Sequence, residues 1–251
     1  MGQRRRTRDP HVSNVLWVAF PYICLTSFVV GHFWRYRYDK FGWTTRSSQI
    51  YERRLLGWAS PLFHFGILGV LAGHFIGLVI PESVTGALGI SEGLYHAVAA
   101  TAGSVAGLMT ATGLALLVYR RRLTPSVFRV TTRMDKAMYL LLGAVIAIGA
   151  FNTIAINLLG PGHDYRLDVA VWFRSVFWLQ PDAALMAGAP ITFQIHALLA
   201  FALLGLWPFT RLVHVFSVPV GYLARPYVVY RTRDSRTGAR APRRGWETPG
   251  S

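Results

Sequence analysis

The sequence predicts an all-α integral membrane protein, a bundle of five transmembrane helices. Of the 251 residues, 53% are hydrophobic and only 15% are charged. Five apolar runs are each long enough for the roughly 20 helical residues that cross a hydrocarbon core of about 30 Å. They lack the alternation of a membrane barrel, so helices must satisfy the backbone in lipid. The expected spans are Val15–Phe33, Trp58–Ile80, Tyr95–Tyr119, Ala137–Leu159 and Pro190–Val215.

A basic extension, residues 1–11, precedes the first span. Positive charge followed by an apolar run is also the order of a secretory signal peptide. No small-x-small cleavage site follows, however, and Pro21 interrupts the run. We therefore expect this run to be kept as the first membrane helix. Cys24, the only cysteine, lies inside it, which excludes an intramolecular disulfide or a CxxC site.

The second span contains two histidines, His64 and His74, in the stretch FHFGILGVLAGHFIG, which has no other polar side chain. Ionisable groups inside a membrane span are costly and mark a functional site by default. The helix also carries four glycines that would admit a flat ring or, equally, a closely packed neighbouring helix. These are Gly66, Gly69, Gly73 and Gly77.

The five spans form one membrane domain, which we expect to cover residues 12–225. We find no internal repeat and no second domain. Residues 226–251 are rich in Arg, Pro and Gly, cannot bury a core, and are expected to be a flexible basic tail. The chain also lacks a glycine-rich phosphate loop, an HExxH motif and a Gly-x-Ser-x-Gly motif.

Basic residues predict the orientation. Of the 26 Lys and Arg, twenty lie in the connections after the first and third spans and in the chain from Arg211 onward, which share one side. The positive-inside rule places these segments and the C-terminus in the cytoplasm and the N-terminus outside. Four N-terminal arginines oppose this assignment but are outnumbered. The net charge of +15 therefore suits membrane lipids and orientation, and no nucleic-acid partner is expected.

The fifth span contains His196 and His214, which would share one face of a straight helix because eighteen residues make five turns. This helix and the second run in opposite directions. Two pairs are therefore expected by level: His74 with His196 nearer the outside, and His64 with His214 nearer the cytoplasm. The axial separations differ, about 27 Å against about 15 Å, so helix tilt or a break at the proline in the fifth span must reconcile them.

Two neutral imidazoles from facing helices, in apolar surroundings without carboxylate or thiolate, suit haem b. Its iron takes two axial nitrogens, and its ring fits a slot between helices. Zinc would need a third and a fourth ligand at each level, and none is in reach. The sequence therefore predicts two haem b groups, one held by His64 and His214 and one by His74 and His196.

Other basic side chains have weaker assignments. Arg121 and Arg122, at the cytoplasmic end of the third span, are candidate partners of the inner haem propionates, although positive-inside anchoring explains them equally well. The remaining loop and edge histidines, His11, His32 and His163, are expected to face solvent or lipid headgroups.

Several longer motifs resemble the gamma subunit of respiratory nitrate reductase, a dihaem cytochrome b. They are WRYRYDKFGWT with RSSQ after the first span, SPLFHFGILGVLAGHFIG in the second, RRRLTP after the third, and FQIHALLAF through LWPFTRLVHVFSVPVGYLARPY in the fifth. The resemblance covers nearly the whole chain except the basic extension and the tail.

The resemblance implies the same haem ligands as the pairing by level. It also implies a cytoplasmic membrane protein that oxidises menaquinol or ubiquinol near the outer haem. Electrons would pass to a cytoplasmic iron–sulfur beta subunit and then to a molybdenum alpha subunit that reduces nitrate. The chain would then have no catalytic residue acting on nitrate, and turnover would require these partners.

The quinol site departs from the family pattern. Similar proteins carry a lysine near the start of the third span, whereas Tyr95 and His96 occupy roughly that place here. His96 could donate a hydrogen bond to a quinol oxygen or accept its proton, although an interfacial histidine without a role is an equal alternative. The predicted quinol site therefore consists of Gly73, His74 and His96.

Two alternatives stay open at this stage. The same architecture would suit the cytochrome b of a formate dehydrogenase, a hydrogenase or a heterodisulfide-reductase-like complex. A different class, a cofactor-free transporter or scaffold, would use the histidines as proton relays or interhelical hydrogen bonds.

Overall fold

The computed structural model describes residues 10–39, 43 and 51–217. In these ranges the chain is helical and contains no strand. Most of the basic extension and the whole predicted tail lie outside them, so that domain division stays a prediction. The elements are α1 (Pro10–Asn14), η1 (Val15–Ala19), α2 (Phe20–Tyr38), α3 (Arg54–His74), η3 (Phe75–Val79), α4 (Glu82–Ala87), α5 (Glu92–Leu123), α6 (Pro125–Arg129), α7 (Arg133–Phe151), η4 (Asn152–Leu158), α8 (Val169–Phe177), α9 (Ala183–Gly188), α10 (Ile191–Leu206), η5 (Trp207–Phe209) and η6 (Arg211–Ser217).

Five helices of the described part are long and apolar enough to cross a membrane, which confirms the predicted helical class and the number and order of spans. They are His11–Tyr38, Arg54–Val79, Glu92–Leu123, Arg133–Leu158 and Ile191–Phe209. The helices extend past the apolar runs because polar residues continue or cap them. Ser91 accepts a hydrogen bond from the Leu94 amide, and Thr132 forms a capping box with Asp135.

The first helix continues through Pro21, which the sequence analysis treated as an interruption of the run. A wider π-helical turn, η1, comes directly before it. Proline has no N–H to donate to the carbonyl four residues earlier, which belongs to Trp17. The indole N–H of Trp172, on α8, donates to that carbonyl at 3.0 Å. The proline is therefore tolerated because another helix supplies the missing donor.

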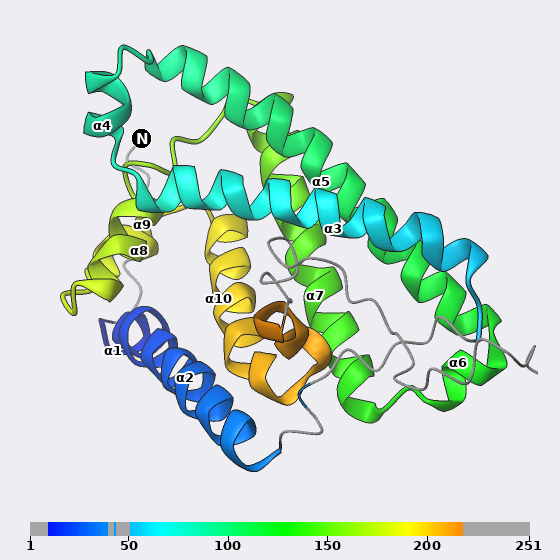
Figure 1. Cartoon of the computed structure of the whole chain (residues 1–251). Coiled ribbons are helices and arrows are strands. Elements are labelled where there is room, and N and C mark those ends of the chain that lie inside the picture. Colours follow the sequence, from blue (N-terminus) through cyan, green and yellow to red (C-terminus); the bar gives the residue numbers. More distant parts are fainter. Residues whose placement is uncertain (1–9, 40–42, 44–50, 218–251) are drawn as a thin grey trace, which may run out of the picture. The chain divides into compact units, whose positions relative to one another are not determined.

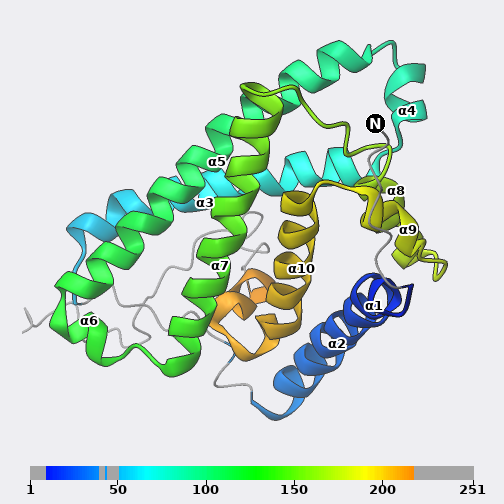
Figure 2. The ribbon, with the colours of Figure 1, turned by 180° about the vertical axis from the view of Figure 1, so that it is seen from behind.

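Glycines allow the long helices to approach closely. A Cβ on Gly66 of α3 would lie 2.6 Å from the Thr110 amide nitrogen of α5, and a Cβ on Gly113 of α5 would lie 2.5 Å from the Phe63 amide nitrogen of α3. Figures 1 and 2 show α3 and α5 side by side along much of their length. These two glycines therefore serve helix packing.

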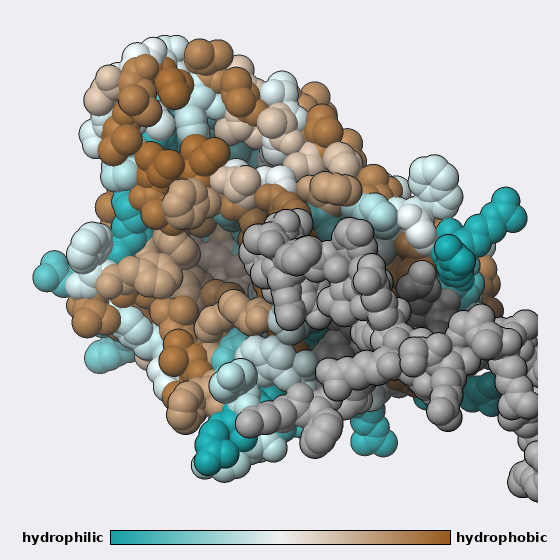
Figure 3. Space-filling view, viewed as in Figure 1, coloured by the Kyte–Doolittle hydropathy of each residue, from teal (hydrophilic) through white to brown (hydrophobic). Residues whose placement is uncertain are grey.

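The surface of the spans is apolar. Large hydrophobic side chains that point away from the bundle include Phe65 at 69% exposure and Leu140 at 78%. Figure 3 shows hydrophobic residues spread over the visible helices, with hydrophilic residues gathered mainly towards the edges. Exposed apolar surface of this extent is expected where helices face lipid.

The bundle has two ends, which we name by their short helices. The α8 end carries α4, α8 and α9, and the α6 end carries α6 and η6 (Figure 1). The main aromatic core lies towards the α8 end and includes Trp17, Trp172 and Phe201. Which end faces the cytoplasm stays a prediction.

The fifth span breaks at its proline, which is one of the two ways in which the axial separations were expected to be reconciled. His196 and His214 do not lie on one straight helix, because α10 ends at Leu206 and is followed by the short 3-10 turns η5 and η6. Pro208 lies at this break and cannot continue the α-helical hydrogen bonds. His214 is therefore placed by η6 and not by the periodicity of α10.

Candidate functional site: two histidine pairs

Four histidines from α3, α10 and η6 form two pairs, with ring planes at 72° in one and 35° in the other. The ring centres of His64 and His214 are 6.1 Å apart, and those of His74 and His196 are 6.0 Å apart. The first pair lies towards the α6 end and the second towards the α8 end. The spatial pairing predicted from the order of the helices is thus confirmed. Metal binding by these rings is a separate prediction.

Both separations fit two imidazoles on one iron. A ligating nitrogen lies about 2.0 Å from its metal and roughly 1.1 Å from the ring centre, so two ligating rings have centres about 6.2 Å apart. Within the described ranges, no group of three or more His, Cys, Asp or Glu side chains comes together. Each pair therefore offers two nitrogens, as haem b requires, and not the four ligands of a structural zinc site.

Backbone carbonyls fix the tautomer of three of the rings. The Nδ1 atom of His64 lies 2.7 Å from the Ser60 carbonyl, and that of His74 lies 2.8 Å from the Val70 carbonyl. The Nδ1 atom of His214 lies 2.6 Å from the carbonyl of Arg211. A carbonyl only accepts, so each Nδ1 must carry the proton and donate it.

The Nε2 lone pair of these rings is consequently available to a metal. An outer hydrogen bond from one nitrogen and a free lone pair on the other is the usual arrangement of metal-binding histidine. His196 differs, because its Nδ1 has no hydrogen-bond partner among the described residues. The His196 ring instead lies within hydrogen-bond reach of the Val145 backbone on α7.

Contacts from two helices hold the segment that carries His214. From α2, the Arg35 guanidinium donates to the carbonyls of Pro208 and Thr210. From α7, the Asp135 carboxylate accepts two hydrogen bonds from the Arg211 guanidinium, at 2.6 and 2.9 Å. The Arg211 carbonyl also accepts a hydrogen bond from His214 Nδ1. Arg211 therefore connects α7 to the His214 ring.

Asp135 and Arg211 were not predicted from the sequence. A signal was available, because TTRMD has the Thr-x-x-Asp spacing of a capping box, which places the carboxylate at the start of a helix. Nothing in that pattern identifies the arginine 76 residues later as its partner.

The predicted quinol-site residues have different surroundings. Gly73 lies beside open space, since a Cβ there would meet nothing within 4 Å. His74 is exposed on the same turn of α3. His96 is half-buried, and its Nε2 would lie 3.5 Å from a Cβ on Gly162. The role of these three residues in quinol binding stays a prediction.

A polar cluster lies beside them at the α8 end. The hydroxyls of Tyr95 and Tyr165 are 3.0 Å apart, and both lie close to Gly77. The buried Arg166 guanidinium lies over the Tyr95 ring and donates to Glu92 and to a threonine of α4. Burial raises the pKa of Tyr165, so its phenol stays protonated.

The two predicted propionate partners contact other helices. Arg121 donates to the Thr131 hydroxyl and lies over the Tyr139 ring, and Arg122 lies over the Phe128 ring. Both guanidinium groups are thus engaged with α6, α7 and the connection between them. Their proposed contact with haem stays a prediction.

The neighbouring Arg120, which the sequence analysis did not single out, is buried and paired with the Glu52 carboxylate. This pair ties the end of α5 to the start of α3.

Two histidines expected to be solvated have protein partners instead. The Nε2 of His163 lies 2.9 Å from the Asp168 carboxylate, and its ring packs on Phe193. His32 donates from Nδ1 to the Phe28 carbonyl and packs against Phe216. The expectation was wrong because the aromatic partners, Phe193 and Phe216, are distant in sequence. His11 is exposed.

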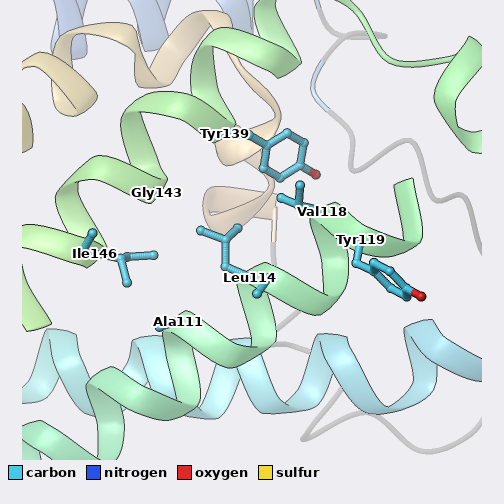
Figure 4. Close-up of a pocket in the computed structure, with 9 residues that line it drawn as sticks. Ala111, Leu114, Val118, Tyr119, Tyr139, Gly143 and Ile146 are labelled. Carbon is cyan, nitrogen blue, oxygen red and sulfur yellow. The ribbon is translucent and has the colours of Figure 1, made fainter. Parts of the chain in front are cut away.

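A separate apolar cavity of about 460 Å³ lies between α5 and α7 (Figure 4). Leu114, Val118 and Ile146 line it, together with Tyr119 and Tyr139. None of the four paired histidines is among its lining residues, so it is not part of either imidazole pair.

Comparisons with known proteins found one matching family and several similar proteins. The profile of the family described as nitrate reductase gamma subunit matches residues 13–233. The nitrate reductase gamma chain of Bacillus subtilis is 45% identical over 220 residues, which cover 88% of this chain and 98% of that protein. The respiratory nitrate reductase 1 gamma chain of Escherichia coli is 34% identical over 215 residues, covering 85% and 95%.

A longer relative shares a higher identity. The nitrate reductase-like protein NarX of Mycobacterium tuberculosis is 56% identical over 242 residues, which cover 96% of this chain. The chain spans only 37% of the length of that relative.

Proposed function

Because the chain belongs to the nitrate reductase gamma subunit family, we propose that it is the membrane-anchoring dihaem cytochrome b of a quinol-oxidising nitrate reductase complex. Menaquinol or ubiquinol would be oxidised beside the His74–His196 pair. Electrons would leave at the α6 end to an iron–sulfur beta subunit, and a molybdenum alpha subunit would reduce nitrate.

The observation that supports this proposal best is the geometry of the two pairs. Their ring separations, 6.1 and 6.0 Å, suit two axial ligands on one iron. The Nδ1 hydrogen bonds of His64, His74 and His214 leave Nε2 available in each of these rings. A proton relay would instead have to pass protons through both ring nitrogens.

In this proposal, haem b bound at each pair supplies a one-electron carrier. The four histidines would hold it through a ring nitrogen each, and apolar side chains of the spans would exclude water. The open space beside Gly73 would admit the quinol ring next to His74. His96 would accept a proton from a quinol oxygen, because its imidazole is suited to proton exchange near neutral pH.

The basic residues at the α6 end would bind the partner subunit and anionic lipid. Arg122, Arg129 and Arg133 gather there on α5, α6 and α7. In the predicted orientation this end faces the cytoplasm, where the beta subunit would dock.

Purified protein tests the proposal. A reduced-minus-oxidised spectrum should show b-type bands at two haems per chain. His74→Ala and His64→Ala should each reduce the content to about one haem, because each variant removes one axial ligand. His96→Asn is the control for a lost imidazole, and it should keep both haems while slowing quinol oxidation. A folded, colourless wild-type preparation would contradict the proposal and favour a scaffold.

A further inference from the structure

Basic residues are rare at the α8 end of the spans. The two connections at this end, between α3 and α5 and between α7 and α10, contain only two of the 26 Lys and Arg of the chain. These two are Arg166 and Arg174. The positive-inside rule disfavours basic residues on the outer side, where the predicted orientation places this end. Orientation therefore explains neither arginine.

Contacts within the chain account for Arg166. Its guanidinium is buried and lies 4.0 Å from the centre of the Tyr95 ring. It donates to the Glu92 carboxylate at 3.0 Å and to the Thr85 hydroxyl at 2.9 Å. These contacts connect the loop before α8 to α4 and α5, which gives this arginine a structural role.

Arg174 has no such carboxylate. It is half-buried on α8 and belongs to no ion pair within the described ranges. Its Nη1 donates to the Leu78 carbonyl at 3.0 Å, which uses one of the five N–H donors of a guanidinium. Burial and the charge of the nearby Arg166 lower the pKa of Arg174 below its ordinary value. An uncompensated charge with donors to spare suits an anion.

The contact with Leu78 places Arg174 about one helical turn from His74. Leu78 is four residues after His74 on the same continuous helix, so it lies roughly 6 Å nearer the α8 end. The helix α8 packs against η3, and Figures 1 and 2 show α8 beside this end of α3. The guanidinium therefore lies near the edge of the span, one turn beyond the His74–His196 pair.

We propose that Arg174 binds a propionate of the haem at the His74–His196 pair. Haem b carries its two propionates on one edge of the ring, beyond the axial ligands. Two donors of the guanidinium match the two oxygens of a carboxylate, so the contact is a bidentate ion pair. It neutralises both charges at the membrane edge. The inference rests on the proposed function, because it assumes haem at this pair.

The ion pair has a measurable consequence. A guanidinium beside the haem stabilises the reduced state, because reduction adds negative charge. Arg174→Gln removes the positive charge, while its amide can still donate to the Leu78 carbonyl. The equilibrium of the haem at this pair should shift about threefold to tenfold towards oxidation, which lowers the midpoint potential of a one-electron couple by about 30–60 mV. The other haem should keep its potential, and both should stay bound.

Arg54→Gln is the matched control. It removes an exposed guanidinium from the opposite end of α3, about 30 Å from His74 along the helix. Solvent ions screen an exposed charge at this distance, so both potentials should match the wild type. Arg174→Lys keeps the charge and should return the potential most of the way.

Infrared difference spectra identify the carboxylate itself. The protein is loaded with haem labelled with ¹³C in its propionate carboxyl groups, and reduced-minus-oxidised spectra are compared. The labelled bands should shift in Arg174→Gln and should match the wild type in Arg54→Gln. Unshifted bands in Arg174→Gln overturn the inference, whatever the potential does. A lower melting temperature with unshifted bands would show a capping role alone, and a raised KM for quinol with unshifted bands would show contact with the quinol instead.

The outcomes separate the two proposals. A wild-type protein without haem overturns the proposed function. Two haems per chain with unshifted bands in Arg174→Gln overturn the propionate contact alone. If Arg174→Gln does not fold, a high-resolution map of the wild-type complex decides. A propionate within hydrogen-bond distance of the Arg174 guanidinium supports the inference, whereas propionates directed away from it overturn it.

Discussion

At the scale of single residues, the paired histidines of α3 show how the backbone of a membrane helix can set the tautomer of an imidazole. A helical carbonyl ordinarily accepts one hydrogen bond, yet it has a second lone pair. Ser60 and Val70 use this capacity to accept from the imidazole one turn later. The donor of each ring is thereby paired by the backbone of its own helix, and at His64 the Ser60 hydroxyl also lies 3.2 Å from Nδ1.

Helix contacts at single glycines lead to the first stability prediction. Gly66→Ala should destabilise the protein by about 1–3 kcal/mol, because the added methyl meets the Thr110 backbone, which cannot move aside as a side chain would. Gly57→Ala in the same helix meets nothing within 4 Å and should be neutral or stabilising by up to about 1 kcal/mol. Thermal unfolding in detergent measures both, and equal melting temperatures would contradict the packing argument.

Glu52 gives a prediction about pH. A hydrogen bond from the Leu55 amide, with the Arg120 guanidinium, holds the pKa of Glu52 below its ordinary value of 4.5. A lowered folded-state pKa contributes stability that is fully present above the ordinary value and is lost as the pH falls through the lowered one. The wild type should therefore lose stability below about pH 4.5, and part of this loss should be absent in Glu52→Gln.

Melting temperatures between neutral and acidic pH test this expectation. Glu82→Gln is the control, because it removes a carboxylate that forms no ion pair among the described residues. An identical acid profile for wild type and Glu52→Gln would show that the pair with Arg120 contributes nothing.

The sequence predicted the paired histidines but missed most of the residues that support them. His64 and His74 are polar residues in an apolar run, so each can be recognised as a candidate without knowing its partner. Arg211 and Asp135 are significant only as an ion pair, and the sequence does not show that pair because 76 residues separate them.

At the scale of elements, the break after α10 decides where His214 lies. A straight continuation would have put this residue about 27 Å from His196 along the helix axis, farther than the histidines of α3 are from each other. The 3-10 turns after Leu206 redirect the chain. Sequence periodicity could not give this path, because a proline shows where a helix breaks but not the direction that follows.

The ion pair between α7 and η6 leads to the second stability prediction. Asp135→Asn should destabilise the protein by up to about 3–5 kcal/mol, since it leaves the charge of Arg211 without its carboxylate in a buried place. Because Arg211 also orients His214, the haem proposed at the His64–His214 pair should be lost more readily than the other. Haem content and the two midpoint potentials measure this separately from turnover.

A double variant controls for the charge itself. Asp135→Asn combined with Arg211→Gln removes both charges and should recover part of the stability, because no unpaired charge stays buried. If the single variant keeps both haems with unaltered potentials, the ion pair does not position His214.

At the scale of the whole molecule, hydropathy alone predicted the all-helical class and the five spans in order. Burial in lipid makes every span apolar, so its length and place are readable from composition. The packing partners are not readable in this way, because apolar surface is common to all five helices. Close approach at glycines and a few polar contacts decide which helices meet, and these depend on the three-dimensional arrangement.

Orientation is the remaining large-scale property, and the charges predict it. The connection around α6 is strongly basic, while the α4 connection between α3 and α5 has no lysine or arginine. Moving a basic segment across the bilayer is opposed during insertion, so the α6 end should face the cytoplasm.

Cysteine labelling tests this orientation. Ser83→Cys at the α8 end and Val130→Cys at the α6 end place a thiol at an exposed position, and the native Cys24 is buried. In intact cells a membrane-impermeant maleimide should label Ser83→Cys, and Val130→Cys should react only after permeabilisation. The reverse pattern would place the His74–His196 pair on the cytoplasmic side, and the proposed docking of the beta subunit at a cytoplasmic α6 end would then be wrong.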